Sequence, residues 1–458
     1  MANMAEREQL GSRLGFLLLT AGCAIGLGNI WRFPYIVGNH GGAIFVLIYI
    51  GFLLILGFPI MVAELSLGRA AQSDYPDAFR KLGPERGNWW TVIAHPIFAG
   101  NVILLMFYCV ITGWLLSYGW EFLVHGFPAE RDSAVYFGGF LADWKRMLFF
   151  DLLGIVMTIA ICMAGVRAGI ERSMKIMLGG LFLLELLIIA LILPYEGATD
   201  GLRFFLTPDP SKLAHGKLAP AVFAAMTQAF FSLSLGIGSV AICGSYIKKE
   251  RSLAGESILI ILLDTMAAIA AGMIIFPACF ALDVQPDQGP SLIFITLTKV
   301  FQAMPNGRLL GTVFFLFTSV AALSTLVAVS ENVIAFLMRS RSVSRRKATL
   351  FFGVMIFVLS LPCLFGFNLL QNIHPLGGNS NILDLEDFIV SDNLLPLGAL
   401  LIVLFCTRRS GWGETAFLAE ANAGKGWRLP RWIVFYIKWV LPILIVLLWA
   451  FNMYTRFC

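Results

Sequence analysis

The chain has 458 residues, of which 58% are hydrophobic and only 13% are charged, and its mean hydropathy is +0.81. This composition is typical of an integral membrane protein and excludes a string of soluble domains. The net charge is +5. The first residues are polar through Gln9, and the apolar run that follows is too long for a cleavable signal peptide.

Cysteine and histidine patterns give no sign of a metal centre or an enzyme active site. The eight cysteines mostly lie within apolar runs and form no CxxC pair, so we expect them to be buried small side chains. The five histidines show no HExxH spacing, and no Ser/His dyad or paired-Asp motif is present. We therefore expect a protein that is not an enzyme.

Eleven segments are apolar over roughly the 20 residues that a helix needs to cross a bilayer. Lys and Arg gather at one set of segment ends, as in 248–251 and 339–347, which places the N-terminus in the cytoplasm and, with an odd span count, the C-terminus outside. The expected location is the cell inner (plasma) membrane. The predicted segments are 13–37, 42–67, 89–124, 149–165, 170–193, 220–246, 252–282, 310–336, 348–365, 388–406 and 432–453.

The first apolar segment contains a predicted helix interruption. Gly22, Gly26 and Gly28 fall within seven positions, and each weakens a helix by about 1 kcal/mol relative to Ala. Unwound backbone at membrane depth is tolerated only beside protein or water, where its carbonyls can bind a cation and a helix N-terminus can bind an anion. Asn29 and Arg32 follow at once, which favours an ion and small-anion site over the alternative of a glycine-softened packing helix.

The sixth apolar segment contains a second interruption, at Gly236 and Gly238, just after Ser232 and Ser234. Interruptions in corresponding positions of two five-helix halves are typical of an inverted-repeat transporter with its site at the midplane. The predicted fold is thus an all-α integral membrane protein with an inverted five-plus-five helix repeat, broken first and sixth helices and one extra C-terminal helix. The predicted divisions are a cytoplasmic segment (1–12), a transporter core (13–406) with repeats 13–193 and 220–406, and a cytoplasmic loop with the eleventh helix (407–458).

Several motifs follow one another along most of the chain. They include Gly26-Leu-Gly-Asn-Ile-Trp-Arg-Phe-Pro34, Gly68-Arg69, Gly169-Ile-Glu-Arg172, Gln228-Ala-Phe-Phe-Ser-Leu-Ser-Leu-Gly236 and Leu383-Asp-Leu-Glu-Asp-Phe388. In sequence and order they resemble the neurotransmitter:sodium symporter family, and the eleven predicted spans resemble its shorter bacterial branch of amino-acid transporters.

The resemblance implies two sodium sites. The first would use Ala24, Asn29, Ser232 and Asp264 with the substrate carboxylate, and the second Gly22, Ile25, Ala321, Ser324 and Thr325. Two alternatives stay open: a protonated, hydrogen-bonded Asp264, and hydroxyls that only bond their own helix. Chloride-dependent relatives carry a serine where this chain has Ala268, so we expect the fixed carboxylate of Asp264 to remove any chloride requirement.

The resemblance also implies a substrate site beside the two breaks. The substrate carboxylate would meet amides near Gly26 and Gly28 and the hydroxyl of Tyr108, and no acid lies between Ala21 and Gly28 to bind a bare amine. A neutral hydrophobic amino acid is therefore expected. The predicted substrate-binding residues are Cys23, Ala24, Gly26, Gly28, Leu104, Tyr108, Phe231, Ser232, Ser234, Ile237, Thr325 and Val329.

Charged pairs are expected to gate the site from both sides. Arg32 and Asp387, with Phe231 as a lid, match the outer gate of the family. Arg7 and Tyr246 match the inner gate. The usual inner acid is missing, since Arg339 occupies its place. Two alternatives stay open: Glu64 or another acid substitutes for it, or the inner gate closes less tightly.

These features together predict a sodium-coupled symporter that carries a neutral amino acid into the cell by alternating access. The expected partners are the amino acid, sodium ions and membrane lipid, without nucleic acid, and the expected functional unit is a monomer. The alternative is a non-transporting amino-acid sensor or a leak channel on the same scaffold.

Overall fold

Nearly every apolar segment predicted above is helical in the computed structural model, which describes residues 9–84, 89–128, 130–213, 218–282, 284, 290–378 and 380–457. These ranges contain no β-strand. The first half of the bundle contains α1 (Arg13–Ala24), η1 (Gly28–Arg32), α2 (Phe33–Asn39), α3 (Ala43–Phe52), η2 (Leu53–Gly57), α4 (Phe58–Ala71), α6 (Trp89–Val124), α8 (Trp144–Met163), η3 (Val166–Glu171) and α9 (Arg172–Ile192).

The second half contains α11 (Leu218–Ser232), α12 (Ser239–Gly244), α13 (Leu253–Phe280), α15 (Gly307–Ser340), α16 (Arg345–Phe365), α17 (Ile382–Asp387), η6 (Phe388–Leu394), α18 (Leu395–Thr407), α20 (Arg431–Phe435), η7 (Tyr436–Val440) and α21 (Leu441–Phe457). The connecting elements are α5 (Tyr75–Leu82), α7 (Ser133–Ala142), α10 (Ala198–Leu206), η4 (Pro210–Leu213), η5 (Leu292–Leu297), α14 (Thr298–Ala303) and α19 (Glu414–Ala421). Of the η elements, η4 is a 3-10 helix and the others are π-helical turns.

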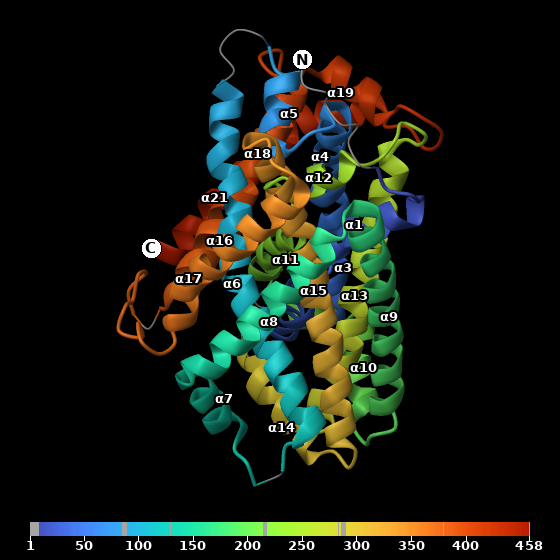
Figure 1. Cartoon of the computed structure of the whole chain (residues 1–458). Helices are drawn as coiled ribbons and strands as arrows, with labels where there is room; N and C mark the ends of the chain where they lie inside the picture. Colours follow the sequence, from blue (N-terminus) through green and yellow to red (C-terminus); the bar gives the residue numbers. More distant parts are fainter. Residues whose placement is uncertain are drawn as a thin grey trace.

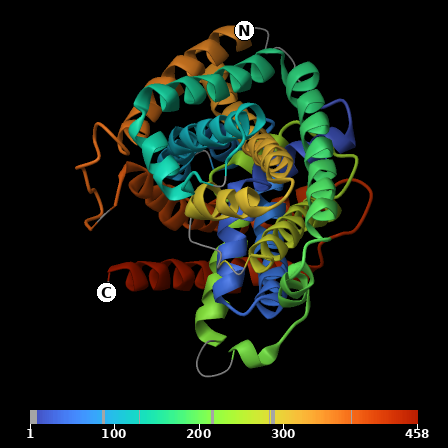
Figure 2. The same ribbon diagram turned by 90° about the horizontal axis from the view of Figure 1, so that it is seen from below.

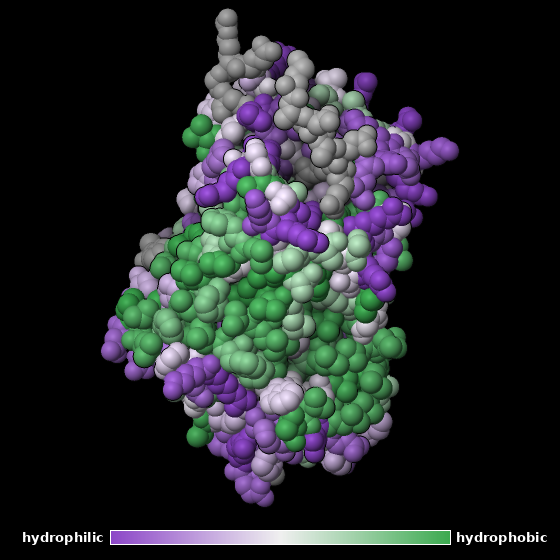
Figure 3. Space-filling view, viewed as in Figure 1, coloured by the Kyte–Doolittle hydropathy of each residue, from purple (hydrophilic) through white to green (hydrophobic). Residues whose placement is uncertain are grey.

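The helices form one bundle whose ends carry different connecting elements. α5 and α19 lie at one end, called here the α5 end, and α7, α10 and α14 lie at the other, called the α14 end (Figure 1). On the face drawn in Figure 3, a broad apolar belt lies between two polar ends. Side chains such as Leu183 and Leu186 of α9 are exposed in this belt, as lipid-facing residues should be.

The described residues contain nine helices that are long and apolar enough to cross a membrane, or ten if the bent pair formed by α1 and residues 28–39 counts as one span. α11 and α12 each fall short of a full span because the second break separates them. The multi-span, all-helical architecture is thus confirmed, while the count of eleven stays a prediction.

Both predicted helix breaks are present. α1 ends at Ala24, and the helix that resumes at Gly28 is bent by 58° from it. In the second break, Ser234, Gly236 and Gly238 have φ values of +49°, +109° and +93°. Such left-handed backbone favours glycine, so the two glycines explain why the helix stops here.

The long helix α6 forms the centre of the bundle. Trp114, Tyr118 and Phe122 are spaced by four residues, so they share one helix face, and each is at most 1% exposed. α6 packs against α8 and α15, and the Tyr118 ring lies 5.2 Å from that of Phe315. α15, packed on α6, also contacts α1 and α12, so this pair of helices supports both broken segments.

Candidate functional site

A buried polar cluster lies where the first break meets α11 and α13. Asn29 Nδ2 donates to Asp264 Oδ1 at 2.8 Å, and Ser232 Oγ lies 2.9 Å from both Asn29 Oδ1 and Asp264 Oδ2. Tyr49 Oη on α3 donates to Ser232 Oγ at 2.9 Å. All four side chains are at most 2% exposed. A carboxylate, an amide oxygen and a hydroxyl therefore converge inside the protein, which is a set of oxygen ligands suited to a hard cation.

A second oxygen cluster lies where α1 meets α15. Thr325 Oγ1 donates toward Gly22 O at 3.0 Å and Ile25 O at 3.2 Å. Ser324 Oγ instead bonds Ala321 O of its own helix at 2.8 Å, which is the behaviour expected of an ordinary helix hydroxyl. Ile25 lies just beyond the last residue of α1, so its carbonyl oxygen belongs to the break, where backbone oxygens can contact a cation.

A cavity of about 410 Å³ adjoins both clusters. It reaches from the breaks to Asp384 and Asp387 on α17 and to Arg456 on α21. Ten of the predicted substrate-binding residues line it, while Ile237 and Val329 are buried outside its lining. The ten are Cys23, Ala24, Gly26, Gly28, Leu104, Tyr108, Phe231, Ser232, Ser234 and Thr325.

Two glycines of the first break allow a close approach to the cavity wall. A Cβ atom on Gly26 would lie 2.4 Å from Tyr108 Oη, and one on Gly28 would lie 2.7 Å from Phe231 Cε1. The amide of Leu27 donates to Tyr108 Oη at 3.0 Å. The break therefore presents polar backbone to the cavity only because these two positions lack side chains.

The second break is held by side chains that the sequence did not identify for this role. Glu64 accepts the amide of Gly236 at 2.8 Å, Tyr75 Oη donates to Gly236 O at 3.0 Å, and Asn101 Nδ2 donates to Ile237 O at 2.7 Å. Glu64 also accepts amides at the start of α12. A carboxylate at a helix N-terminus is favourable, so Glu64 stabilises this break.

At the α5 end, Glu331 is the acid that bonds Tyr246. Tyr246 Oη donates to Glu331 Oε1 at 2.5 Å, and the Arg345 guanidinium donates to Glu331 Oε2 at 2.7 Å and Oε1 at 2.9 Å. Glu331 lies near the C-terminal end of the eighth predicted segment, eight residues before Arg339, and was not among the predicted gate residues. Arg7, the other predicted inner-gate residue, lies outside the described residues.

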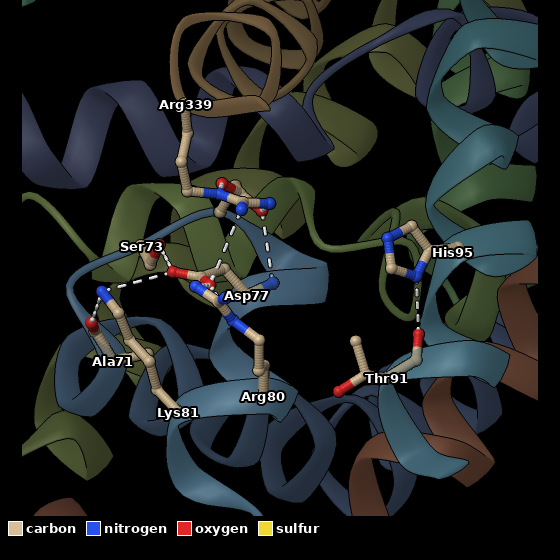
Figure 4. Close-up of polar contacts among 9 residues, drawn as sticks. Ala71, Ser73, Asp77, Arg80, Lys81, Thr91, His95 and Arg339 are labelled. Atoms are coloured by element: carbon tan, nitrogen blue, oxygen red, sulfur yellow. Dashed lines mark hydrogen bonds and ion pairs between the residues drawn. The ribbon is translucent and has the colours of Figure 1, made fainter. Parts of the chain in front are cut away.

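Arg339, which stands where the family acid was expected, joins α15 to α5. Its guanidinium bonds Asp74, with Nη2 at 3.0 Å from Oδ1, and lies 3.7 Å from Asp77. Figure 4 shows Arg339 pointing from α15 to Asp77, which Arg80 and Lys81 also approach. Arg339 therefore pairs with acids at the start of α5 and within it, and so links α15 to α5 at this end of the bundle.

At the mouth of the cavity, the predicted outer gate is not joined. The Arg32 guanidinium lies 4.3 Å from the centre of the Phe231 ring, and Asp387 Oδ1 accepts from Ser391 Oγ at 2.5 Å. Both Arg32 and Asp387 line the cavity, yet within the described part of the chain they form no ion pair with each other. The three predicted outer-gate residues therefore lie close together, but Arg32 and Asp387 are not paired with each other.

A membrane bundle whose two interrupted helices enclose a cavity bordered by oxygen ligands is the architecture of a secondary transporter. The family model described as "Sodium:neurotransmitter symporter family" matches residues 7–136 and 144–456. The chain belongs to this family and is therefore a sodium-dependent symporter of the membrane, not an enzyme.

Individual proteins agree with this assignment. The chain is 33% identical to an uncharacterized sodium-dependent transporter of Bacillus subtilis, YhdH, over 97% of this chain and 98% of that protein. It is 28% identical to the sodium-dependent neutral amino acid transporter B(0)AT2 of Mus musculus, over 59% of this chain and 40% of that protein. The crystal structure of MhsT in complex with L-phenylalanine superposes with a TM-score of 0.85 and 38% identity, covering 97% of this chain and 99% of that chain.

Proposed function

We propose that this protein carries a neutral, chiefly hydrophobic amino acid into the cell together with sodium, by alternating access. The observation that carries this proposal is the cavity: apolar walls from α6, including Leu104 and Phe107, face backbone and hydroxyl groups at the first break. Such a site suits a zwitterion with an apolar side chain. The amino acid in the MhsT complex and the substrate class in the name of B(0)AT2 support the same choice.

We assign the first sodium site to Ala24, Asn29, Ser232 and Asp264 with the substrate carboxylate. The second is assigned to Gly22, Ile25, Ala321, Ser324 and Thr325. Because the substrate carboxylate would complete the first site, sodium raises the affinity for substrate and substrate raises the affinity for sodium by the same factor.

The carboxylate of Asp264 makes chloride unnecessary in this proposal. It is fully buried beside Asn29 and Ser232, so it brings a fixed negative charge to the first sodium site. Uptake measured in sodium gluconate should equal uptake in sodium chloride, and a loss of uptake in gluconate would contradict the proposal.

The proposed orientation places the α5 end in the cytoplasm of a cell bounded by its plasma membrane. Basic residues on α5 and at the end of α15, such as Arg80 and Arg341, support this choice under the positive-inside rule. The cavity then faces outward, Arg32, Asp387 and Phe231 form the outer gate, and Tyr246 belongs to the inner gate. A monomer surrounded by lipid suffices for this cycle, because one chain contains both breaks.

A thermal-shift screen of the purified protein against the twenty amino acids tests the function. A ligand at a hundred times its Kd should stabilise the protein by about 2.7 kcal/mol, in sodium but not in potassium. Stabilisation by neutral hydrophobic amino acids in sodium alone is the expected result. Equal stabilisation in both salts would contradict the proposal that substrate binding is coupled to sodium.

The variant Asp264→Ala tests the first sodium site directly. It should abolish sodium-dependent ligand stabilisation without unfolding the protein, because the carboxylate supplies the charge that holds the ion. Asp151→Ala is the matched control, since Asp151 is also fully buried in a membrane helix but bonds Ser360, away from the cavity. Unchanged sodium dependence in Asp264→Ala would overturn the assignment.

A further inference from the structure

The last helix of the chain places a polar face against the mouth of the cavity. α21 lies at the edge of the bundle (Figure 2), and its first turns are apolar. Trp449, Asn452 and Arg456 are spaced by three and four residues, so they share one face of the helix. Polar groups on a membrane helix need partners inside the protein.

All three side chains find these partners on η6. Trp449 Nε1 donates to Asn393 Oδ1 at 3.1 Å, Asn452 Nδ2 donates to Asp392 Oδ1 at 2.9 Å, and Arg456 Nη1 donates to Asp392 Oδ2 at 2.5 Å. The Asp392 side chain is only 11% exposed, so its pair with Arg456 is partly shielded from water. α21 is therefore fastened to η6 by charge as well as by packing.

η6 is the element that follows the outer-gate acid. It is a π-helical turn that begins at Phe388, directly after Asp387. π-helical turns are rare and occur frequently at functional sites. The Arg456 guanidinium lies 4.6 Å from the centre of the Phe388 ring, and Arg456 lines the same cavity as Arg32 and Asp387. The position of α21 thus bears on the direction in which Asp387 points.

The same helix also contacts the element that carries the lid. The Phe451 ring stacks on that of Phe223 in α11, with centroids 3.8 Å apart. α11 continues to Phe231, against which the Arg32 guanidinium lies. α21 therefore bridges the two elements that supply Phe231 and Asp387 to the outer gate.

We propose that Arg456 is a positioning residue for the outer gate. Its ion pair with Asp392 holds η6 so that Asp387 can meet Arg32 when the cavity closes. This inference rests on the proposed alternating-access function. The outer gate would then include the final helix, although none of the predicted gate residues lies on it.

Labelling of a cavity cysteine tests the inference. Tyr35→Cys, made together with Cys458→Ser, places a thiol on a half-buried, cavity-lining position of α2, and the native cysteines among the described residues are buried. A membrane-impermeant methanethiosulfonate would be applied from outside in potassium, in sodium, and in sodium with L-phenylalanine. The same rates would be measured with Arg456→Gln, Arg456→Lys and Lys438→Gln added. Lys438 is the matched control because it pairs with Glu414 at 2.7 Å in the same final segment, away from the cavity.

Arg456→Gln should raise the labelling rate in potassium about fivefold, the factor that a loss of roughly 1 kcal/mol of closing free energy produces. Arg456→Lys should restore most of the protection, and Lys438→Gln should change nothing. Identical rates for Arg456→Gln and the unmodified reporter in every salt would overturn the inference. Absence of protection by L-phenylalanine in the unmodified reporter would count against the proposed substrate class instead, because the potassium and sodium rates still judge Arg456.

Discussion

The α5 end of the bundle and the mouth of the cavity differ in how their charged side chains are paired. At the α5 end, Glu331 bonds both Tyr246 and Arg345, and Arg339 reaches across to Asp74. At the mouth of the cavity, Arg32 lies against an aromatic ring and Asp387 binds a serine. One end is held shut by pairs between helices, whereas the opposing gate charges at the other end remain apart. We infer that the structure represents an outward-open state of the proposed cycle.

Breaking the Glu331 cluster should have the largest effect. Glu331→Gln takes the Glu331 carboxylate away from the Arg345 guanidinium, which is only 13% exposed, and breaking such a buried pair costs about 3 kcal/mol. We expect a clearly lower melting temperature and a loss of sodium-dependent uptake, measured by thermal shift and in proteoliposomes.

The double variant Glu331→Gln with Arg345→Gln is the control for that prediction. The second substitution also removes the positive charge of Arg345, so part of the lost stability should return. A melting temperature of Glu331→Gln equal to that of the unmodified protein would mean that this cluster does not hold the α5 end closed.

Arg339→Gln should have an intermediate effect at the same end. Its side chain is 35% exposed, so loss of its bonds to Asp74 should cost about 1 kcal/mol. Arg80→Gln is the matched control, because Arg80 also bonds Asp77 but is 62% exposed and lies on the same helix as its partner. A larger loss of stability in Arg80→Gln than in Arg339→Gln would contradict a role of Arg339 in joining α15 to α5.

Acidification should weaken the α5 end slightly through Asp77. Burial alone would raise the pKa of Asp77, but the hydrogen bond from Ser73 and the charges of Arg339, Arg80 and Lys81 outweigh it and lower that pKa. An acid with a lowered pKa in the folded protein stabilises it above the unfolded pKa, and this contribution is lost as the pH falls through the folded pKa. Stability should therefore drop as the pH falls below about 4, the usual range of an aspartate in the unfolded chain, and less so in Asp77→Asn. An equal drop in both proteins would exclude this contribution.

Asp387→Asn should change stability least. Because Asp387 has no ion pair with Arg32 in this state, only its bond from Ser391 is weakened, and the melting temperature should shift little. Uptake should nevertheless fall, because in the proposed cycle the Asp387 carboxylate pairs with Arg32 when the cavity closes. A strong loss of stability with normal uptake would contradict the interpretation that Asp387 acts in closure of the cavity and contributes little to the stability of this state.

Local sequence features predicted the parts of the site that depend on local structure. Gly26, Gly28, Gly236 and Gly238 marked both breaks, because missing side chains act on the backbone where they stand. The resemblance to the family added Asp264 to the predicted site. This residue contacts Asn29 from α13, a helix that is far from the first break in the sequence.

Long-range partners were harder to predict. Tyr49 and Asn101 lie in apolar helices and look like packing residues until α3 and α6 bring them to Ser232 and Ile237. The bond between Glu331 and Tyr246 was missed because an acid near Tyr246 was sought at position 339, eight residues further along α15. Such pairings depend on how helices cross, which spacing within one helix does not specify.

The close fit of Tyr108 against Gly26 limits how the specificity of this protein can change. A Cβ atom at position 26 would lie 2.4 Å from the Tyr108 hydroxyl oxygen, so even alanine would clash there. An aspartate at this position, able to bind a substrate that has no carboxylate of its own, could not be accommodated unless Tyr108 moved or was replaced. A carrier of bare amines that placed its aspartate at position 26 would thus also need a change at Tyr108.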